Sequence, residues 1–257
     1  CDGGVFRTSN NGSSWVDLSK GMGIMQFYRI SSPPSDPNIV IGGAQDNGTN
    51  RWKNGQWLQV AGGDGMKCLF DPGNPNIVYA STPQGAFQKS TNGGNSFIGL
   101  ISRATTLENG AWVTPFAVDP SKTSVLYAGY TNVWKFEPST NKWSKTSTFS
   151  GLGSLTYLTI STDGKTIFAG NPNGMYRSKT GATTWERLTL TGVQAGNISA
   201  VAIHPTNPNR VLLPQDPEAA LLYLKATLME GSQTELTSAL AALDQYLAQN
   251  ADAAVEV

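Results

Sequence analysis

Two carboxylate side chains are the first candidates for chemistry in this sequence. Asp46 lies in the stretch Gln-Asp-Asn-Gly, and Asp64 lies in the stretch Gly-Gly-Asp-Gly. A pair of carboxyl groups is the minimum for hydrolysis of a glycosidic bond, with one as the acid and the other as the base or nucleophile. The alternative is structural, because an aspartate in such a turn commonly bonds its own backbone. Asp46 and Asp64 are therefore candidate catalytic residues that have a second, purely structural interpretation.

The composition argues against several other kinds of site. A single histidine, His204, leaves no Ser-His-Asp triad and no histidine-rich metal site, and we expect neither a metal nor a cofactor. The formal net charge of +0 gives no indication of a nucleic-acid partner. No run of about 18 apolar residues is present, so no membrane-spanning helix is expected. The sequence shows no signal peptide. A disulfide between Cys1 and Cys68 stays open, because nothing shows that the two approach each other.

The elements that must position the carboxylates repeat along the chain. The octet Thr-Ser-Asn-Asn-Gly-Ser-Ser-Trp at residues 8–15 recurs closely at 90–97 and loosely at 178–185, and shorter turns fall between. The aromatic residues that close these turns are 42, 40, 46 and 42 residues apart: Trp15, Trp57, Phe97, Trp143 and Trp185. A second motif recurs with a similar spacing. It consists of an apolar strand, a Pro- or Gly-rich turn and another apolar strand. Two interleaved motifs with one period predict a repeat protein.

Each repeat reads as four short strands joined by tight turns. In the second complete unit the strands are expected at 66–70, 77–81, 86–90 and 96–100. Four-stranded units of about 40 to 45 residues predict an all-β fold, a β-propeller of four complete blades with half-blades at both ends. His204 stands where sibling repeats carry Asp71 and Asp119 before proline, so we expect it to shape a turn.

The octets resemble the Asp-box, or BNR repeat, Ser-x-Asp-x-Gly-x-Thr-Trp. This motif is found in sialidases, xyloglucanase-like glycosidases and the sortilin/Vps10 family, where it is a structural turn far from the active site. Asn10, Asn92 and Thr180 replace its aspartate. Longer stretches around 26–49 and 62–81 resemble propellers of large secreted bacterial proteins, which implies a secreted or cell-surface location. The residues assigned to structural Asp-boxes are Thr8, Asn10, Gly12, Trp15, Ser90, Asn92, Gly94, Phe97, Ser178 and Trp185.

The propeller interpretation also predicts where a ligand would bind. In propellers, the loops from second to third strand and from fourth to next first strand share one face beside the central channel. Asp46 and Asp64 map to this face. The candidate ligand-binding residues there are Gln45, Asn47, Gln84, Asn132, Asn171 and Asn173. Aromatic residues near the channel either stack on sugar rings or pack within blades: Trp52, Trp112, Tyr130 and Tyr157.

The two ends of the chain leave the blade count open. The pattern starts with a third strand at 4–8 and a fourth at 14–18, and it ends with a first strand at 198–203 and a second at 210–213. The end pieces either pair into a composite blade of a five-bladed ring or leave an open arc of a larger parent. Closure would pair residues 4–8 with 210–213 and remove exposed sheet edges.

A different composition begins after residue 213, so we predict a propeller over 1–213 and a tail over 214–257. The tail carries one base and seven acids, against 17 bases and 11 acids before it. Leucine stripes predict an α-helical hairpin, with one helix from Asp216 to about Gly231 and another over 234–249. These helices faintly resemble those of addiction-module antidote proteins. Their stripes must bury against the propeller, a partner or another copy.

Three functions remain open from the sequence. The first is an extracellular module that binds a polysaccharide or a protein on its channel face without catalysis. The second is a glycoside hydrolase of the xyloglucanase-like type that uses Asp46 and Asp64. The third is an inactive fragment or fusion of a larger propeller protein. Sialidase chemistry is disfavoured, because the arginines are scattered and match no substrate-binding cluster.

Overall fold

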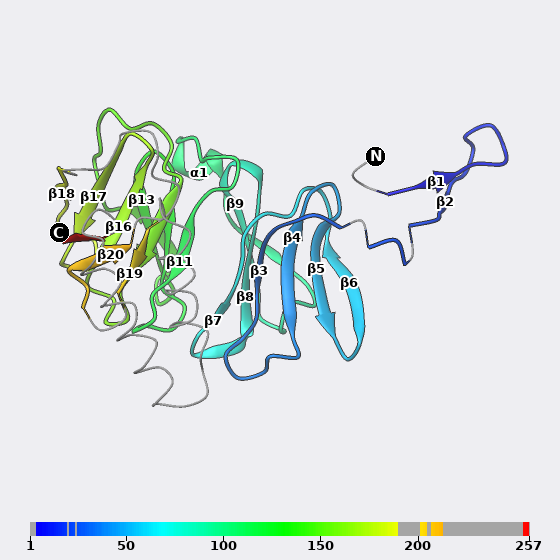
Figure 1. The fold of residues 1–257 in the computed structure, drawn as a ribbon, viewed down its shortest axis with the longest axis horizontal. Helices are drawn as coiled ribbons and strands as arrows, with labels where there is room; N and C mark the ends of the chain where they lie inside the picture. Colours follow the sequence, from blue (N-terminus) through cyan, green and yellow to red (C-terminus); the bar gives the residue numbers. More distant parts are fainter. Residues whose placement is uncertain are drawn as a thin grey trace. The chain divides into compact units, whose positions relative to one another are not determined.

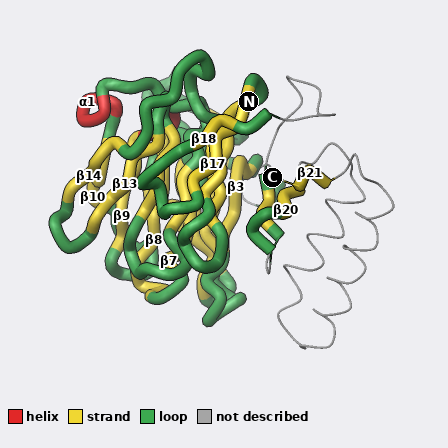
Figure 2. The backbone as a smooth tube through the Cα atoms, turned by 90° about the vertical axis from the view of Figure 1, so that its left-hand side faces the viewer, coloured by secondary structure: helices red, strands yellow, loops and turns green. Residues whose placement is uncertain are grey.

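The computed structural model describes residues 4–19, 21–23, 25–189, 201–204, 207–212 and 254–256. The chain divides into two compact units, Cys1–Thr114 and Pro115–Val257, and each is described by itself. The described part is nearly all β (Figure 2), with one helical turn, α1 (Arg103–Thr106), and one 3₁₀ turn, η1 (Pro83–Gly85).

The first unit contains a hairpin and two four-stranded antiparallel sheets (Figure 1). The hairpin pairs β1 (Phe6–Arg7) with β2 (Val16–Asp17). In both sheets the strands lie side by side in chain order. Sheet 1 consists of β3 (Phe27–Ser31), β4 (Val40–Ala44), β5 (Gly48–Lys53) and β6 (Gln56–Ala61). Sheet 2 consists of β7 (Cys68–Asp71), β8 (Asn74–Thr82), β9 (Ala86–Ser90) and β10 (Ile98–Ile101).

The second unit repeats this pattern. Its strands also follow chain order within each sheet, and all pair antiparallel. Sheet 3 consists of β11 (Phe116–Val118), β12 (Leu126–Gly129), β13 (Val133–Glu137) and β14 (Lys142–Lys145). Sheet 4 consists of β15 (Tyr157–Ile160), β16 (Ile167–Asn171), β17 (Gly174–Ser178) and β18 (Glu186–Arg187). A three-stranded sheet consists of β19 (Ala202–Ile203), β20 (Arg210–Leu212) and β21 (Ala254–Glu256).

The predicted four-stranded repeat is confirmed by these sheets. In the second predicted unit, the third strand falls where expected, and the other three lie within a few residues of their predicted positions. Of the two alternatives for the chain ends, the pairing of residues 4–8 with 210–213 is not found among the described residues. Within the described residues β1 pairs with β2, and β20 is bonded to β19 on one edge and to β21 on the other. β20 therefore has no open edge for β1. The helices predicted at 216–231 and 234–249 lie outside the described residues.

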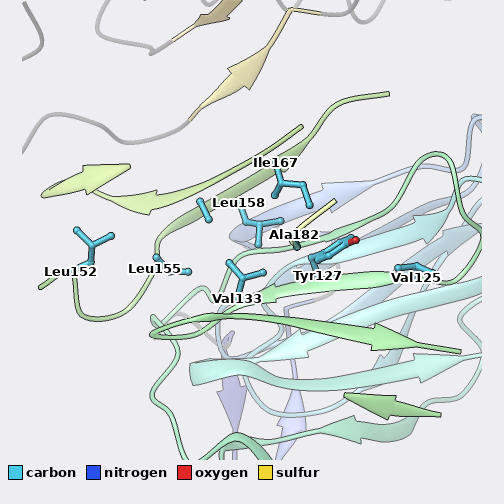
Figure 3. Close-up of a cluster of buried hydrophobic side chains, with 9 residues drawn as sticks. Val125, Tyr127, Val133, Leu152, Leu155, Leu158, Ile167 and Ala182 are labelled. Carbon is cyan, nitrogen blue, oxygen red and sulfur yellow. The ribbon is translucent and has the colours of Figure 1, made fainter. Parts of the chain in front are cut away.

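Apolar side chains on facing sheets form the core of each unit. In the first unit, Ile41 of sheet 1 packs with residues of sheet 2: Cys68, Phe70, Val78 and Ala80. In the second unit, Tyr127 and Val133 of sheet 3 meet Leu158 and Ile167 of sheet 4 (Figure 3). Val125, just before β12, joins this cluster, and Leu152 and Leu155 enter it from the segment between the two sheets. Within each unit, one four-stranded sheet therefore buries a face against the other, as expected for repeats that cannot fold alone.

The three octet turns share one hydrogen-bond scheme. A hydroxyl at the first position accepts the backbone amide four residues on, from Gly12 to Thr8 (2.9 Å), Gly94 to Ser90 (2.9 Å) and Ala182 to Ser178 (3.0 Å). The third residue accepts the amide of the seventh, from Ser14 to Asn10 (2.9 Å), Ser96 to Asn92 (3.1 Å) and Thr184 to Thr180 (2.9 Å). The loose third copy therefore folds as the others do. Its Ala182 adopts φ 71°, in the left-handed region that favours glycine.

The turns between first and second strands use a second kind of cap. Asp71 accepts the Gly73 amide at 2.9 Å, and Asp119 accepts the Ser121 amide at 2.9 Å. His204 Nδ1 accepts the Asn207 amide at 3.2 Å. The imidazole nitrogen thus stands in for a carboxylate oxygen, and the predicted turn role of His204 is confirmed.

Two neighbouring residues at the start of β7 have strongly shifted pKa values. Burial raises the pKa of the Cys68 thiol to about 12, and Cys68 is a free cysteine. Burial lowers the pKa of Lys67 to about 8, and the positive charge of Arg29 adds to this shift. A lysine that loses hydration on folding destabilises the folded state as long as it carries its proton.

The buried hydroxyl of Ser90 gives a test of the turn scheme. Ser90→Ala removes the acceptor of the Asn92 and Gly94 amides in a buried position, so we expect it to lower the free energy of unfolding by about 1–2 kcal/mol. Urea denaturation followed by tryptophan fluorescence measures this loss. Ser96→Ala in the same turn removes an exposed hydroxyl and is the control, with an effect under about 0.5 kcal/mol. Equal losses for both variants would contradict the scheme.

Lys67 gives a pH-dependent test. At pH 7, Lys67→Met removes a desolvated charge, and we expect a gain in stability of about 1 kcal/mol or more. Because the folded-state pKa of about 8 lies below the ordinary 10.5, the folded protein releases this proton first. Loss of the Lys67 proton therefore raises the free energy of unfolding of the wild type between these two pH values. The difference in stability between Lys67→Met and the wild type becomes smaller over the same range. Urea unfolding at pH 7, 8.5 and 9.5 measures the difference. The exposed Lys53 supplies the control variant, Lys53→Met, and a pH-independent gain for Lys67→Met would contradict desolvation.

Candidate functional site

The loops at one end of sheets 1 and 2 form a shared surface, which we call the loop face. It consists of the β4–β5 loop at 45–47, the segment after β6 at 62–67, the β8–β9 loop at 83–85 and the segment at 107–114. The β4–β5 and β8–β9 loops both join a second strand to a third, so they emerge at equivalent ends of adjacent sheets. The Gly65 amide donates to the Ala44 carbonyl at 3.1 Å and ties the first two segments together.

The structure brings the Asp64 carboxylate to the backbone of Asp46. The backbone amide of Asp46 donates to Asp64 Oδ1 at 2.8 Å, across 18 residues of chain. Asp46 has φ 57°, and its residue is exposed, whereas Asp64 is half-buried. Asp64 therefore holds the Asp46 turn in shape, and Asp46 itself is open to solvent. The Asp64 side chain thus bonds the backbone of a different turn, 18 residues away along the chain.

The neighbouring amides Gln45 and Asn47 are tied into the same turn. The backbone N–H of Gln45 donates to the backbone carbonyl of Gln26 at 3.0 Å, and this bond joins the loop to the start of β3. Asn47 Nδ2 donates to the Gln45 carbonyl at 3.0 Å, and the Asn47 carbonyl accepts from Gln59 Nε2 at 2.9 Å. Both residues are half-buried, so each presents only part of its side chain to a ligand.

Gln84 belongs to a second cluster on the loop face. Gln84 is exposed with φ 61°, and its backbone amide donates to the Trp112 carbonyl at 3.2 Å. The Trp112 indole nitrogen donates to the Tyr28 hydroxyl at 3.3 Å. Sequence reasoning did not single out Tyr28, because an aromatic residue in an apolar strand reads as core. Its contact with Trp112 spans 84 residues, and no local pattern announces it.

In the second unit, two of the predicted ligand-binding residues are buried, and their side-chain amides form hydrogen bonds within the protein. Asn132 is buried, and its Oδ1 accepts the Phe149 amide at 2.7 Å and the Ser147 hydroxyl at 3.1 Å. Asn171 is also buried, and its Nδ2 donates to the Leu152 and Ser154 carbonyls. Asn173 is exposed, with its amide bonded to Asn171 Oδ1 at 2.9 Å. The buried pair therefore fixes the segment between strands, and Asn173 alone of the three is open to solvent.

The four aromatic candidates for sugar stacking separate clearly by exposure. Tyr130 is 0% exposed and Tyr157 is 5% exposed, and the Tyr157 hydroxyl bonds the Gly174 carbonyl at 3.0 Å. Trp52 is half-buried and lies 5.6 Å from the Trp57 ring. Trp112 is 52% exposed. For Tyr130 and Tyr157 the packing interpretation applies, whereas Trp112 has an accessible ring.

A cleft of about 890 Å³ lies beside sheet 1 and meets the loop face at Asn47. Phe27 and Trp57, with ring centroids 5.4 Å apart, give it an aromatic wall. Its remaining lining residues are Asp17, Ser19, Gly21, Gly23, Met25, Asn50 and Gln56.

The described ranges contain neither a candidate metal cluster nor a candidate membrane-spanning helix. Within those ranges, no group of three or more His, Cys, Asp or Glu residues is placed to hold a metal ion. Their helical segments also include none with the length and apolarity needed to cross a bilayer.

Comparison with known proteins connects the chain to others through structure. No family model matches the sequence, and no curated protein matches it. An ancestral GH74 enzyme aligns with 72% of this chain at 18% identity and a TM-score of 0.60, and 27% of its own length is covered. The GH74 xyloglucanase from Xanthomonas campestris aligns with 80% of this chain at 20% identity and a TM-score of 0.55, with 39% of its length covered.

A third similar structure has a different description. The extracellular domain of a hybrid two-component system from B. thetaiotaomicron aligns with 73% of this chain at 14% identity and a TM-score of 0.56, with 26% of that chain covered. This chain thus spans well under half the length of each of these three proteins. Because GH74 enzymes and the extracellular domain of a two-component system match with similar TM-scores, the similarity concerns the fold and not the activity. What they share with this chain is a β-propeller fold built from four-stranded antiparallel sheets.

Proposed function

We propose that this chain is a β-propeller module of an extracellular bacterial protein that binds a glycan through the loop face. The observation that carries the proposal is the convergence of Asp46 and Asp64, joined by a 2.8 Å hydrogen bond from separate loops. Carboxylates and amides on one face suit a ligand rich in hydroxyl groups. The GH74 neighbours support a glycan-related propeller at the level of the fold. The three octet turns are assigned as Asp-box turns. The extracellular location of the protein is proposed from its resemblance to secreted proteins.

Binding without turnover is preferred because of how the carboxylates are placed. A general acid at neutral pH is ordinarily a carboxyl group in an apolar pocket, paired with a second carboxylate of different environment. Asp46 is exposed to solvent, and Asp64 accepts the Asp46 amide. Neither arrangement supplies the apolar pocket. The proximity of the two residues nevertheless favours a glycoside hydrolase as the second candidate function.

The proposal predicts a carboxylate-dependent affinity for β-glucans without bond cleavage. Asp46→Asn and Asp64→Asn each remove a charged hydrogen-bond acceptor, so we expect each to weaken binding about tenfold. Isothermal titration with soluble β-glucan oligosaccharides measures the affinity, and a reducing-end assay measures cleavage. Asp36→Asn is the matched control, because Asp36 caps the β3–β4 turn at the opposite end of the same sheet through the Asn38 amide at 3.0 Å. Its affinity should match the wild type.

Two results would overturn this proposal in different ways. New reducing ends that disappear in both Asp46→Asn and Asp64→Asn would establish the hydrolase. Absence of glycan binding by protein that unfolds in one sharp transition would leave a protein ligand as the remaining function, because an inactive fragment is expected to unfold over a broad transition.

A further inference from the structure

The face of sheet 1 that is turned away from sheet 2 carries three aromatic rings. Successive residues of a strand point to opposite faces of the sheet. Arg51 of β5 points to sheet 2, where its guanidinium donates to Asn95 Oδ1 at 2.6 Å. Trp52, the next residue, therefore lies on the other face, and its ring centroid is 5.6 Å from that of Trp57. The Phe27 ring, 5.4 Å from the Trp57 ring, completes the row.

Two of these rings form the aromatic wall of the cleft beside sheet 1, and both are held in place. A Cβ atom at Gly42 would lie 2.6 Å from Phe27 Cδ1, so the Phe27 ring lies directly on β4. Trp57 stands opposite Trp52 in the register of β5 and β6, and it is 45% exposed. The wall therefore offers accessible ring surface that loses little conformational entropy when a ligand binds.

Asp17 contributes a carboxylate to the same cleft. Its Oδ1 accepts the backbone N–H of Ser19 at 2.8 Å. Ser19 Oγ in turn accepts the backbone N–H of Val5 at 2.9 Å, which ties this end of the cleft to the β1–β2 hairpin. The hydrogen bonds from the Ser19 hydroxyl and the Ser19 backbone lower the pKa of Asp17 below its ordinary value. The carboxylate is therefore ionised at neutral pH.

The described lining residues give this cleft a negative charge. Asp17 is the one acid among them, and none of them is a lysine or an arginine. The basic residues of β5 lie elsewhere, because Arg51 contacts sheet 2 and Lys53 lines a separate hollow at the β5–β6 turn. Lys20 lies outside the described residues. A carboxylate and the faces of aromatic rings both attract a cation.

We propose that this cleft binds a quaternary ammonium group against the rings of Phe27 and Trp57, with Asp17 as its counter-ion. Such a group has no N–H to donate, and a ring face attracts it at distances of up to about 6 Å from the centroid. A primary ammonium group, in contrast, requires acceptors for its N–H donors. The inference does not depend on glycan binding, because it uses neither Asp46 nor Asp64.

The experiment titrates the full chain with choline and with 3,3-dimethylbutan-1-ol, the uncharged carbon analogue of choline, at constant ionic strength. Isothermal titration calorimetry measures both affinities. Because the two probes have the same shape and differ in charge, we expect choline to bind about tenfold more tightly. Trp57→Leu removes a ring face and keeps an apolar side chain, and Asp17→Asn removes the charge. We expect each variant to weaken choline binding about fivefold or more.

Two variants serve as controls. Trp112→Leu removes another exposed tryptophan (52%), one that does not line the cleft. Lys20→Gln removes the lysine that lies between two lining residues in the chain. Both variants should keep the choline affinity within about twofold of the wild type. Thermal unfolding of each variant in one sharp transition shows that it is folded.

Several results would overturn the inference. Equal affinities of the wild type for choline and for the uncharged alcohol would mean that the cleft recognises only apolar shape. A loss of choline binding in Trp112→Leu with none in Trp57→Leu would place the site elsewhere. A gain of about tenfold in Lys20→Gln would show that a lysine already neutralises the Asp17 carboxylate. Absence of choline binding by the wild type overturns the inference and leaves the proposed glycan function to its own test.

Discussion

Burial of one sheet face against the next is the interaction on which the rest of this structure depends. A single four-stranded sheet exposes both of its faces, so it encloses a core only when it packs against another layer. Ile41 meets this requirement in the first unit by packing on Phe70 and Val78 of the next sheet, and Leu158 and Ile167 meet it in the second unit. Because neighbouring sheets are held face to face, the loops at their ends come to lie side by side. The approach of Asp64 to Asp46 is a consequence of this packing.

The octet turns show which property of the motif matters physically. Asparagine or threonine replaces aspartate, and the hydrogen bonds are nevertheless made by Asn10, Asn92 and Thr180 at distances near 3 Å. The turn therefore requires an acceptor oxygen at this position and not a negative charge. The same substitution logic applies at His204, where a ring nitrogen replaces a carboxylate oxygen. Repeats can thus drift in sequence while the turn geometry is retained, which explains why the third copy is hard to recognise.

The loop face gains its shape from backbone hydrogen bonds and keeps a small set of side chains for recognition. Asn132 and Asn171 occupy equivalent loop positions in the second unit. Their side-chain amides bond the backbone of neighbouring segments and are not free to bind a ligand. Exposure, and not residue type, is what distinguishes Trp112 from Tyr130 and Tyr157. The proposed recognition surface in the first unit is therefore the part of a repeated scaffold where polar and aromatic groups remain accessible.

The sequence by itself determined the repeat, the class of fold and the turn chemistry, because strand periodicity and turn residues are local properties of the chain. Third-strand positions such as Ala86–Ser90 and the role of His204 followed directly from spacing. Tertiary structure alone decided that β20 is bonded on both edges, that Asn132 and Asn171 are buried, and that Tyr28 meets Trp112. These outcomes depend on which sheet or segment lies against each residue. That neighbour is contributed by residues tens of positions away, so no local pattern encodes it.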